Sequence, residues 1–443
     1  MFAMIRLALS AALFPAILAP APAAADELRD RIAADLPGLM ATYRDFHANP
    51  ELSFNEFRSA AIMAAAARKA GLVVTEKVAK TGIVAVLKNG PGPTVLIRAD
   101  MDALPVVEQT GLAYASKVRA TPASGVETGV MHACGHDTHM TAWIETARLL
   151  AARKREWSGT LVMIGQPAEE TGQGARAMLA DGLFTRFPKP DYALAFHDMS
   201  AVPAGVVAYA AGPAMANVDS IDMEVGGIGG HGAAPHTTKD PIVLAAAIVM
   251  RLQTLISRDN DPLQPAVITV GSFHAGSKYN IISDRAKLQL TVRSFSDEQR
   301  EKLIAGIRRV AAAEAMASGL PENLAPKITL GEGFAPALIN EPGFAEQVIA
   351  PLRERFGETR VVKLPPIMAG EDFSLYRRAD SEHIQSLMLW IGGERPETIA
   401  AAKRNGKPLP SLHSPFWAPD AEKVIATGAE ALTSAAMRLM PKI

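Results

Sequence analysis

Short apolar runs alternate with longer alanine-rich or amphipathic stretches in the first half of the chain, up to about residue 212. The runs have the length of buried strands, and the longer stretches have the length of helices. We expect strands at 94–98, 160–164 and 192–196, and helices at 59–70 and 138–155. Strands that alternate with helices predict an α/β domain with a mainly parallel sheet, whose sites form beyond the carboxyl ends of the strands.

The pattern changes between about residues 218 and 333. We expect strand 218–226, helix 241–257, strands 266–273 and 286–293, helix 297–317 and strand 327–331. This βαββαβ order is ferredoxin-like and predicts a compact inserted domain. The mixed α/β pattern then returns, with helices near 342–356 and 420–438. We therefore predict one domain made of residues 26–216 and 334–443, interrupted by an inserted domain of residues 217–333.

The first 25 residues follow a different pattern. Arg6 precedes an apolar run from Leu7 to Leu18, and alanine and proline continue up to Ala25. A basic start, about a dozen apolar residues and an Ala-x-Ala exit are typical of a secretory signal peptide. The run is shorter than the roughly 20 residues that span a bilayer. We expect cleavage after residue 25, export to the periplasm or the medium, and no later segment long and apolar enough to bind a membrane.

Composition limits the function further. The 443 residues are 49% hydrophobic and 21% charged, and the formal net charge is −1. This balance is that of a soluble globular protein and gives no reason to expect nucleic acid, so a small-molecule partner is expected. Cys134 is the only cysteine, which excludes an internal disulfide. A lone thiol in an oxidising compartment is exposed to oxidation unless something occupies it.

Candidate metal ligands gather around this cysteine and after the predicted strands. Cys134 and His136 offer a thiolate and an imidazole, which suit zinc or a related metal, although ordinary packing remains open. Glu169 and Glu170 follow the 160–164 strand, and two adjacent carboxylates there are either a solvated turn or a ligand beside a general base. We expect His132 and His139 to orient neighbours or to pack.

Three further positions complete the candidate chemistry. His197 ends a predicted strand, and His413 lies in a proline-stiffened loop; each alone is more often a surface histidine, but together they bring the ligands to five. Asp100 and Asp102 follow the 94–98 strand, where they could hold a ligand histidine or simply cap the strand. The set is sufficient for one or two metal ions.

Seven motifs together resemble those of the M20 metallopeptidase family, in its branch of aminoacylases, hippurate hydrolases and auxin-conjugate hydrolases. The resemblance runs from about Tyr43 to the His413 loop. The motifs are Arg98–Pro105, His132–Asp137, Pro167–Glu170, Gly229–His236, Tyr279–Asp284, Arg293–Phe295 and Gly370–Ser374. As a set they are highly specific.

The resemblance implies a dinuclear metal centre and a dimer. It implies two divalent ions, manganese or zinc, with cobalt or nickel also accepted. It implies that the inserted domain forms a homodimer and acts as a lid. The implied residues are Cys134, His136, Glu170, His197 and His413 as ligands, Glu169 as the general base with Asp102 in the catalytic group, and His231 and Asn280 as substrate-binding residues.

The expected activity is hydrolysis of the amide bond of an N-acetyl, benzoyl or aryl-acyl amino acid by metal-activated water. A dipeptidase or carboxypeptidase on the same scaffold is the alternative, and a binding protein without turnover is disfavoured by the complete ligand set. The sequence departs from relatives at Ile228, where arginine is frequent, at Gly232, and at Asp198-Met199-Ser200. These departures affect the shape of the substrate pocket and remove no ligand.

Overall fold

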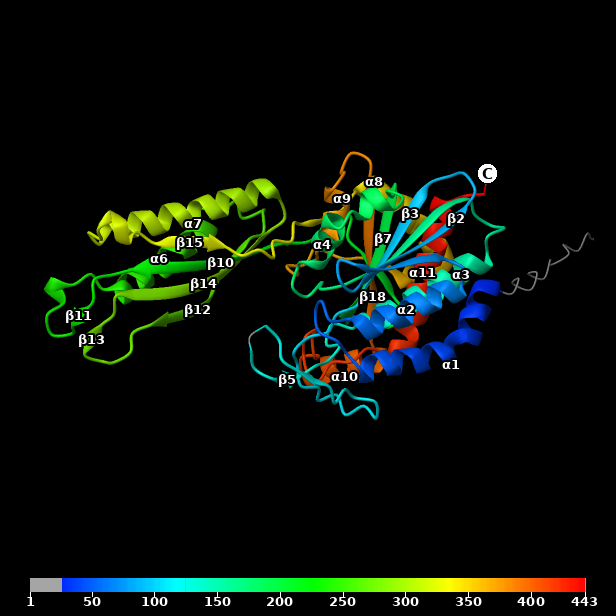
Figure 1. Ribbon diagram of the computed structural model, residues 1–443, viewed down its shortest axis with the longest axis horizontal. Helices are drawn as coiled ribbons and strands as arrows, with labels where there is room; N and C mark the ends of the chain where they lie inside the picture. Colours follow the sequence, from blue (N-terminus) through cyan, green and yellow to red (C-terminus); the bar gives the residue numbers. More distant parts are fainter. Residues whose placement is uncertain (1–25, 124, 443) are drawn as a thin grey trace, which may run out of the picture.

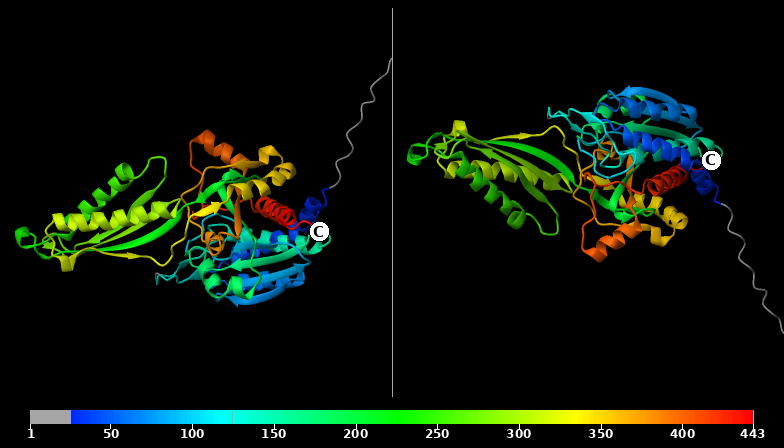
Figure 2. Two further views of the ribbon diagram at one scale, coloured as in Figure 1. Left: turned by 90° about the horizontal axis from the view of Figure 1, so that it is seen from above. Right: turned by 90° about the horizontal axis from the view of Figure 1, so that it is seen from below.

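The computed structural model describes residues 26–123 and 125–442. A large sheet covered by helices forms one part of the molecule, and a smaller elongated part extends away from it (Figures 1 and 2). The predicted signal peptide, residues 1–25, lies outside the described residues and stays a prediction.

The large sheet has eight strands in the order β1-β2-β6-β3-β7-β18-β8-β17. Its four central strands, β6, β3, β7 and β18, are parallel, whereas β1, β2 and β8 each pair antiparallel with a neighbour. The predicted α/β class with a mainly parallel sheet is therefore confirmed. The strands are β1 (Val73–Val78), β2 (Gly82–Asn89), β3 (Thr94–Asp100), β6 (Gly159–Gln166), β7 (Tyr192–Pro203), β8 (Val207–Tyr209), β17 (Val361–Lys363) and β18 (Gln385–Glu394).

Alternation along β3 shows why helices cover both faces of this sheet. Val95 and Ile97 are buried in one core, and Leu96 between them is buried in another. Successive side chains of a strand point to opposite faces, so a strand that is apolar throughout needs cover on both sides. The first core is covered by α1 (Glu27–Ala48), α2 (Phe57–Lys69), α3 (His136–Ala152), α8 (Pro342–Phe356) and α11 (Ala421–Leu439), and the second by α4 (Gly174–Ala180), α5 (Leu183–Arg186) and α9 (Ser374–Arg378).

The elongated part is a four-stranded antiparallel sheet in the order β12-β14-β10-β15, with two helices on one face (Figure 2). In β10 and β14 buried and more exposed residues alternate, as expected for a sheet with one covered face. The predicted βαββαβ order is confirmed. The elements are β10 (Asn217–Gly226), α6 (Pro241–Thr254), β12 (Val267–Ala275), β14 (Arg285–Ser294), α7 (Asp297–Ala317) and β15 (Lys327–Leu330).

Short elements complete the chain. The pair β11 (Gly230–His231) and β13 (Ile281–Ile282) lies at the end of the elongated part that is farthest from the large sheet (Figure 1). The others are β4 (Arg119–Ala120), β5 (Thr128–Gly129), β9 (Gly212–Met215), β16 (Leu338–Asn340) and α10 (Pro396–Asn405).

One expectation about membranes is wrong. Among the described residues, the continuous helix Pro241–Asp259 is long and apolar enough to cross a membrane, judged by length and composition alone. Leu244, Ile248 and Leu252 are nonetheless buried against the four-stranded sheet, while Val243 and Met250 are exposed. One side of the helix therefore belongs to a protein core, as in a soluble amphipathic helix. The absence of membrane binding stays a prediction.

Candidate functional site

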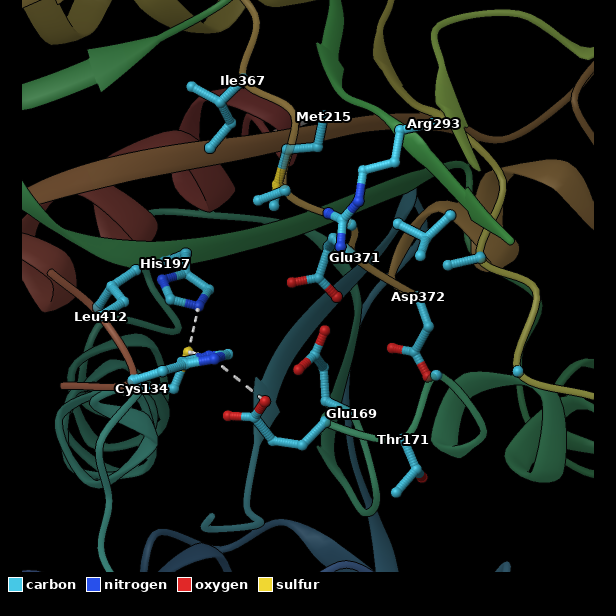
Figure 3. Close-up of a pocket in the computed structure, with 18 of the residues that line it drawn as sticks. Cys134, Glu169, Thr171, His197, Met215, Arg293, Ile367, Glu371, Asp372 and Leu412 are labelled. Carbon is cyan, nitrogen blue, oxygen red and sulfur yellow. Dashed lines mark hydrogen bonds and ion pairs between the residues drawn. The ribbon is translucent and has the colours of Figure 1, made fainter. Parts of the chain in front are cut away.

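A cavity of about 720 Å³ opens beside the carboxyl ends of the central strands (Figure 3). Both parts of the molecule line it. The large-sheet part contributes Cys134, Glu169, Glu170, His197 and His413, and the elongated part contributes Val218, Ser220 and Arg293. Four of the five predicted metal ligands and the predicted general base thus face one space.

The turn that carries the first two ligands requires a glycine. Gly135 lies between Cys134 and His136 with a φ of +81°, and α3 begins at the next residue. A β-carbon at position 135 would collide with the carboxylate of Asp198, which follows His197 on β7. Glycine is therefore needed here both for its backbone conformation and for the close approach of the neighbouring strand.

The turn after β6 is held in a strained conformation by two buried carboxylates. Ala168 has a φ of +51°, which is unfavourable for a residue with a side chain. The carboxylate of Glu56 accepts a hydrogen bond from the Ala168 amide at 2.9 Å. The two oxygens of Asp102 accept from the amides of Glu169 and Glu170, each at 3.0 Å. These contacts fix the two glutamates against the sheet.

Asp102 supports the site differently from the expectation. Its carboxylate lies 3.6 Å from Nδ1 of His136, and the short contact of that ring, 2.7 Å, is to the backbone carbonyl of Asp102. A carbonyl oxygen only accepts, so Nδ1 carries a hydrogen and Nε2 is the nitrogen left to bind a metal. The carboxylate itself holds the Glu169–Glu170 turn, so one residue supports both a ligand and the predicted general base.

The remaining ligand side chains converge on the thiol. His197 donates Nδ1–H to the carbonyl of Asp198 at 2.7 Å, which leaves its Nε2 3.4 Å from Cys134 Sγ. His413 Nε2 lies 3.2 Å from the same sulfur and 3.5 Å from Glu170 Oε2. His413 has a φ of +68°, a second strained position at the site.

The donor atoms fit a pair of divalent metal ions. Two groups of three, Cys134–His136–His197 and Cys134–Glu170–His413, each have their donor atoms within 4.8 Å of one another, and they share the sulfur. Nε2 of His136 and Oε1 of Glu170 are buried and have no hydrogen-bond partner among the described residues. Buried polar atoms rarely stay unpaired, and a mixed set of sulfur, imidazole and carboxylate suits zinc or manganese.

Burial sets the protonation of these groups in the protein itself. It raises the pKa of the Cys134 thiol well above its usual value, and it raises the pKa of Glu170 to about 8. Burial and the nearby His136 and His197 lower the pKa of His413, which favours the neutral imidazole that binds metal. A cation among these side chains would favour the thiolate and the carboxylate.

Glu169 extends into the cavity beside the ligands (Figure 3). Burial, followed by the charges of Glu371 and Glu170, raises the pKa of Glu169 well above its usual value. A carboxyl group with a raised pKa in a cleft is suited to taking up and returning a proton. This arrangement matches the role expected for Glu169.

Two histidines, His132 and His139, were expected to orient neighbours or to pack, and His139 orients its neighbours. Nδ1 of His139 donates to Asp100 at 2.6 Å, and Nε2 accepts the amide N–H of Asp198 at 3.0 Å. Both nitrogens are therefore engaged within the protein. His132 is buried without a hydrogen-bond partner for either nitrogen among the described residues, and burial lowers its pKa to about 4.

The two predicted substrate-binding residues lie elsewhere. His231 belongs to β11 and Asn280 directly precedes β13, so both are at the far end of the elongated part (Figure 1). Both are exposed, and neither lines the cavity of its own chain. Sequence reasoning gave no role to Arg293 and Glu371, which do line the cavity. Both lie in motifs on which the family resemblance rests, Arg293–Phe295 and Gly370–Ser374. The motifs could therefore have pointed to these two residues, but they did not indicate what the residues do.

A family model, "Peptidase family M20/M25/M40", matches residues 96–407. The chain is 38% identical over 349 residues to the hippurate hydrolase of Campylobacter jejuni, covering 77% of this chain and 86% of that one. It is 38% identical over 337 residues to thermostable carboxypeptidase 2 of Saccharolobus solfataricus, covering 75% and 81%. It is 34% identical over 361 residues to the N-acetyl-L-cysteine deacetylase of Bacillus subtilis, covering 80% of each.

Solved structures agree with the sequence comparisons. A Bacillus subtilis dinuclear metal binding peptidase from the M20 family superposes with a TM-score of 0.72 and 30% identity, covering 91% of this chain and 98% of that one. A chain from methicillin-resistant Staphylococcus aureus gives a TM-score of 0.80 at 30% identity, covering 94% and 99%. The chain belongs to the M20 peptidase family, and the predicted metal-dependent amidohydrolase is confirmed at that level.

Proposed function

We propose that the protein hydrolyses the amide bond of N-acyl amino acids, with Glu169 as the general base. The observation that carries the proposal is that one cavity holds both the proposed metal ligands and an arginine side chain, Arg293. Among the described residues that line the cavity, Arg293 is the only lysine or arginine. Its Nη1 donates to the carbonyl of Met368 at 2.6 Å, and no described carboxylate forms an ion pair with it. Burial lowers its pKa, as expected for a desolvated cation without a counter-charge.

A free carboxylate on the substrate would supply that counter-charge. An N-acyl amino acid carries one carboxylate, two bonds from the nitrogen of its amide. Arginine pairs well with a carboxylate because its guanidinium can donate two parallel hydrogen bonds. Arg293 is therefore the proposed anchor of the amino-acid end, and it comes from the elongated part of the molecule.

Apolar side chains elsewhere in the cavity suit the acyl group. Met215, Ile367, Trp390 and Leu412 line it together with the charged residues. Binding sites commonly combine an apolar wall with a few polar groups that set orientation. Acetyl, benzoyl and aryl-acyl groups are all compatible with this wall.

The residues of the chain divide the proposed reaction among them. Cys134, His136, Glu170, His197 and His413 would hold two divalent ions, manganese or zinc. Such ions polarise a carbonyl and lower the pKa of water toward about 7. Glu169 takes a proton from the attacking water, and it returns that proton to the nitrogen as the C–N bond breaks. The Asp102 carboxylate keeps Glu169 in place through its backbone amide.

A carboxypeptidase or dipeptidase is the second candidate, because a relative with 38% identity is named a carboxypeptidase. A free dipeptide would bring an ammonium group into the cavity, and Glu371 is a carboxylate that lines it. The two activities share the carboxylate anchor and differ in the substrate's amino end. Blocking that end therefore distinguishes them.

The test is a hydrolysis panel with residues 26–443 loaded with manganese or zinc. The panel pairs N-acetyl and N-benzoyl amino acids with free dipeptides and with the same acyl amino acids as carboxamides. We expect metal-dependent cleavage of the blocked acids, with a KM for the carboxamides at least about 10-fold higher because Arg293 loses its partner. A preference for free dipeptides would make the protein a peptidase, and no cleavage at all by metal-loaded protein would contradict both.

Export and dimerisation also belong to the proposal. Export rests on the leader-like sequence of residues 1–25. Dimerisation through the elongated part is supported by its exposed apolar side chains, among them Val243, Met250 and Tyr279. A second copy would also explain how His231 and Asn280 could reach a substrate, because their own cavity lies at the other end of the elongated part.

A further inference from the structure

Glu371 presents an unused hydrogen-bond acceptor to the cavity. It lies in the Gly370–Ser374 motif, and its side chain is fully buried. Its Oε1 accepts from Arg98 Nη2 at 2.8 Å and from the Phe373 amide at 2.9 Å. Its Oε2 has no hydrogen-bond partner among the described residues. Leaving a buried carboxylate oxygen unpaired is costly, so a ligand that supplies a donor would be favoured.

The carboxylate is held rigidly in this orientation. Arg98 is itself fully buried and donates to Asp100 at 2.6 Å and to Gln166 at 3.0 Å as well as to Glu371. Each of these residues belongs to or directly follows a central strand or the Gly370–Ser374 motif. Oε2 therefore cannot turn to find a partner inside the protein without breaking the contacts of Oε1.

Glu371 lies between the proposed carboxylate anchor and the general base. Arg293 donates to the carbonyl of Met368, in the same loop as Glu371. Glu371 and Glu169 line the same cavity, and the charge of Glu371 is, after burial, the largest cause of the raised pKa of Glu169. Figure 3 shows the three side chains in the order Arg293, Glu371, Glu169 along the cavity, with Cys134 to one side of Glu169.

An N-acyl amino acid has its functional groups in the same order. The carboxylate comes first, then the amide N–H, then the carbonyl that is attacked. With the carboxylate at Arg293 and the carbonyl beside Glu169 and the ligand cluster, the N–H falls between them. We propose that Oε2 of Glu371 accepts a hydrogen bond from the N–H of the scissile amide. This inference rests on the proposed function and names a residue that contacts the reacting nitrogen.

The contact would strengthen during the reaction. When the C–N bond breaks, the nitrogen takes the bonding electron pair and receives a proton from Glu169. Positive charge grows on the nitrogen. The carboxylate of Glu371 stabilises this charged nitrogen more than it stabilises the neutral amide. Interactions that are stronger in the transition state raise kcat, whereas interactions of equal strength only lower KM.

The test compares amide and ester with the variant Glu371→Gln. Gln can keep an oxygen at the position that Arg98 and the Phe373 amide contact, and it turns an NH₂ donor toward the cavity. The substrates are N-benzoylglycine and O-benzoylglycolate, which differ only in N–H against O. We expect kcat/KM of the variant to fall about 10- to 100-fold for the amide and to stay within about 3-fold for the ester.

Glu332→Gln is the matched control, because Glu332 also lines the cavity but is exposed. It should leave the amide-to-ester ratio unchanged. Equal losses of Glu371→Gln on both substrates would show a structural role through Arg98 and overturn the inference. If wild-type protein cleaves neither substrate, the proposed function fails instead, so the two failures are distinguishable.

Wild-type protein gives a measurement that does not depend on folding of the variant. N-benzoylsarcosine is N-benzoylglycine with a methyl group in place of the amide hydrogen, so it has no N–H for Glu371 to contact. We expect its kcat to be at least about 10-fold below that of N-benzoylglycine. Equal kcat values for the two amides would overturn the inference even if Glu371→Gln did not fold.

Discussion

Asp102 links the ligand side of the site to its acid-base side. Its carbonyl accepts from His136, and its carboxylate accepts from two backbone amides of the Glu169–Glu170 turn and from Ser53 Oγ at 2.6 Å. Four hydrogen-bonding groups are thus fixed relative to one another by a residue that does not itself line the cavity. Catalytic groups depend on such supporting contacts for their position.

The role of Glu169 can be tested by removing its basicity alone. Glu169→Gln keeps the shape of the side chain but cannot take a proton from water. We expect turnover to fall at least about 100-fold while the protein still binds metal, because the five proposed ligands are unchanged. Initial rates and metal content by mass spectrometry check this, with Glu332→Gln as the control. A near-normal rate would contradict the role of Glu169.

Metal loading should be strongly pH-dependent. The Cys134 thiol has a pKa raised well above its usual value and Glu170 has one raised to about 8, so both carry protons near neutral pH. Metal binding must displace these protons, and affinity should therefore rise with pH through about 8. Titration calorimetry in buffers of different ionisation enthalpy counts the protons released.

We expect more than one proton per protein to be released at pH about 7, and about one fewer for Cys134→Ser, whose hydroxyl stays protonated. The same binding heat in every buffer would contradict this expectation.

At the scale of elements, a buried histidine ties the first helix to two site loops. His47 of α1 contacts Asp137, at the start of α3, at 2.6 Å and Glu108 at 3.0 Å. The amide of Gln109, next to Glu108, donates to the carbonyl of Pro415 at 2.8 Å, close to His413. The chain of contacts thus reaches from α1 to both ends of the ligand cluster.

The contacts of His47 with Asp137 and Glu108 should make the free energy of unfolding depend on pH. Hydrogen bonds to Asp137 and Glu108 outweigh burial and raise the pKa of His47 from 6.5 to about 10. A raised pKa means stability that is fully present below about pH 6.5 and lost as the pH rises through about 10. The loss should amount to a few kcal/mol, roughly.

Denaturant unfolding between pH 6 and 10.5, roughly, measures this effect. His47→Gln should flatten the curve, whereas His236→Gln, at an exposed histidine, should leave its shape unchanged. Parallel curves for wild type and His47→Gln would exclude a charged His47 as the source.

Local pattern was sufficient for some elements and insufficient for others. The apolar runs at β3, β6 and β7 were predicted, because buried parallel strands are apolar along their whole length. β18 was missed although it pairs with β7 at the centre of the sheet and contains an apolar run, 387–391, like those of the predicted strands. α3 ends at Ala152, before the predicted limit, since residues 153–156 form a turn. Periodicity shows that a segment is buried but not which strand lies beside it.

The site shows the same limit. Cys134 and His136 could be proposed as ligands because two donors stand close together in sequence. Arg293 and Glu371 gained a role only from the structure, where β14 and the Gly370–Ser374 loop meet at one cavity. His231 and Asn280 were assigned to the substrate by resemblance, and only the structure shows how far along the elongated part they lie (Figure 1).

At the scale of the whole molecule, the position of His231 predicts that two chains share a site. Glu169→Gln and His231→Ala should each be nearly inactive alone. Co-expressed, they would form mixed dimers in which one site has an intact Glu169 and receives an intact His231 from the partner. We expect about a quarter of wild-type activity in the random mixture.

Hydrolysis of N-benzoylglycine by the co-purified mixture measures this, with the two variants mixed after separate purification as the control. Activity no higher than that of the separate variants would show that His231 does not act across a dimer.

The cavity is lined by residues of both sheets, so each part of the molecule contributes a different portion of the proposed substrate contacts. The proposed metal ligands and general base lie at the edge of the large sheet, whereas the proposed anchor Arg293 belongs to β14 of the four-stranded sheet. Exchanging residues 217–333 between relatives would therefore exchange the proposed carboxylate anchor, while the apolar side chains proposed to contact the acyl group, Met215, Ile367, Trp390 and Leu412, would stay in place.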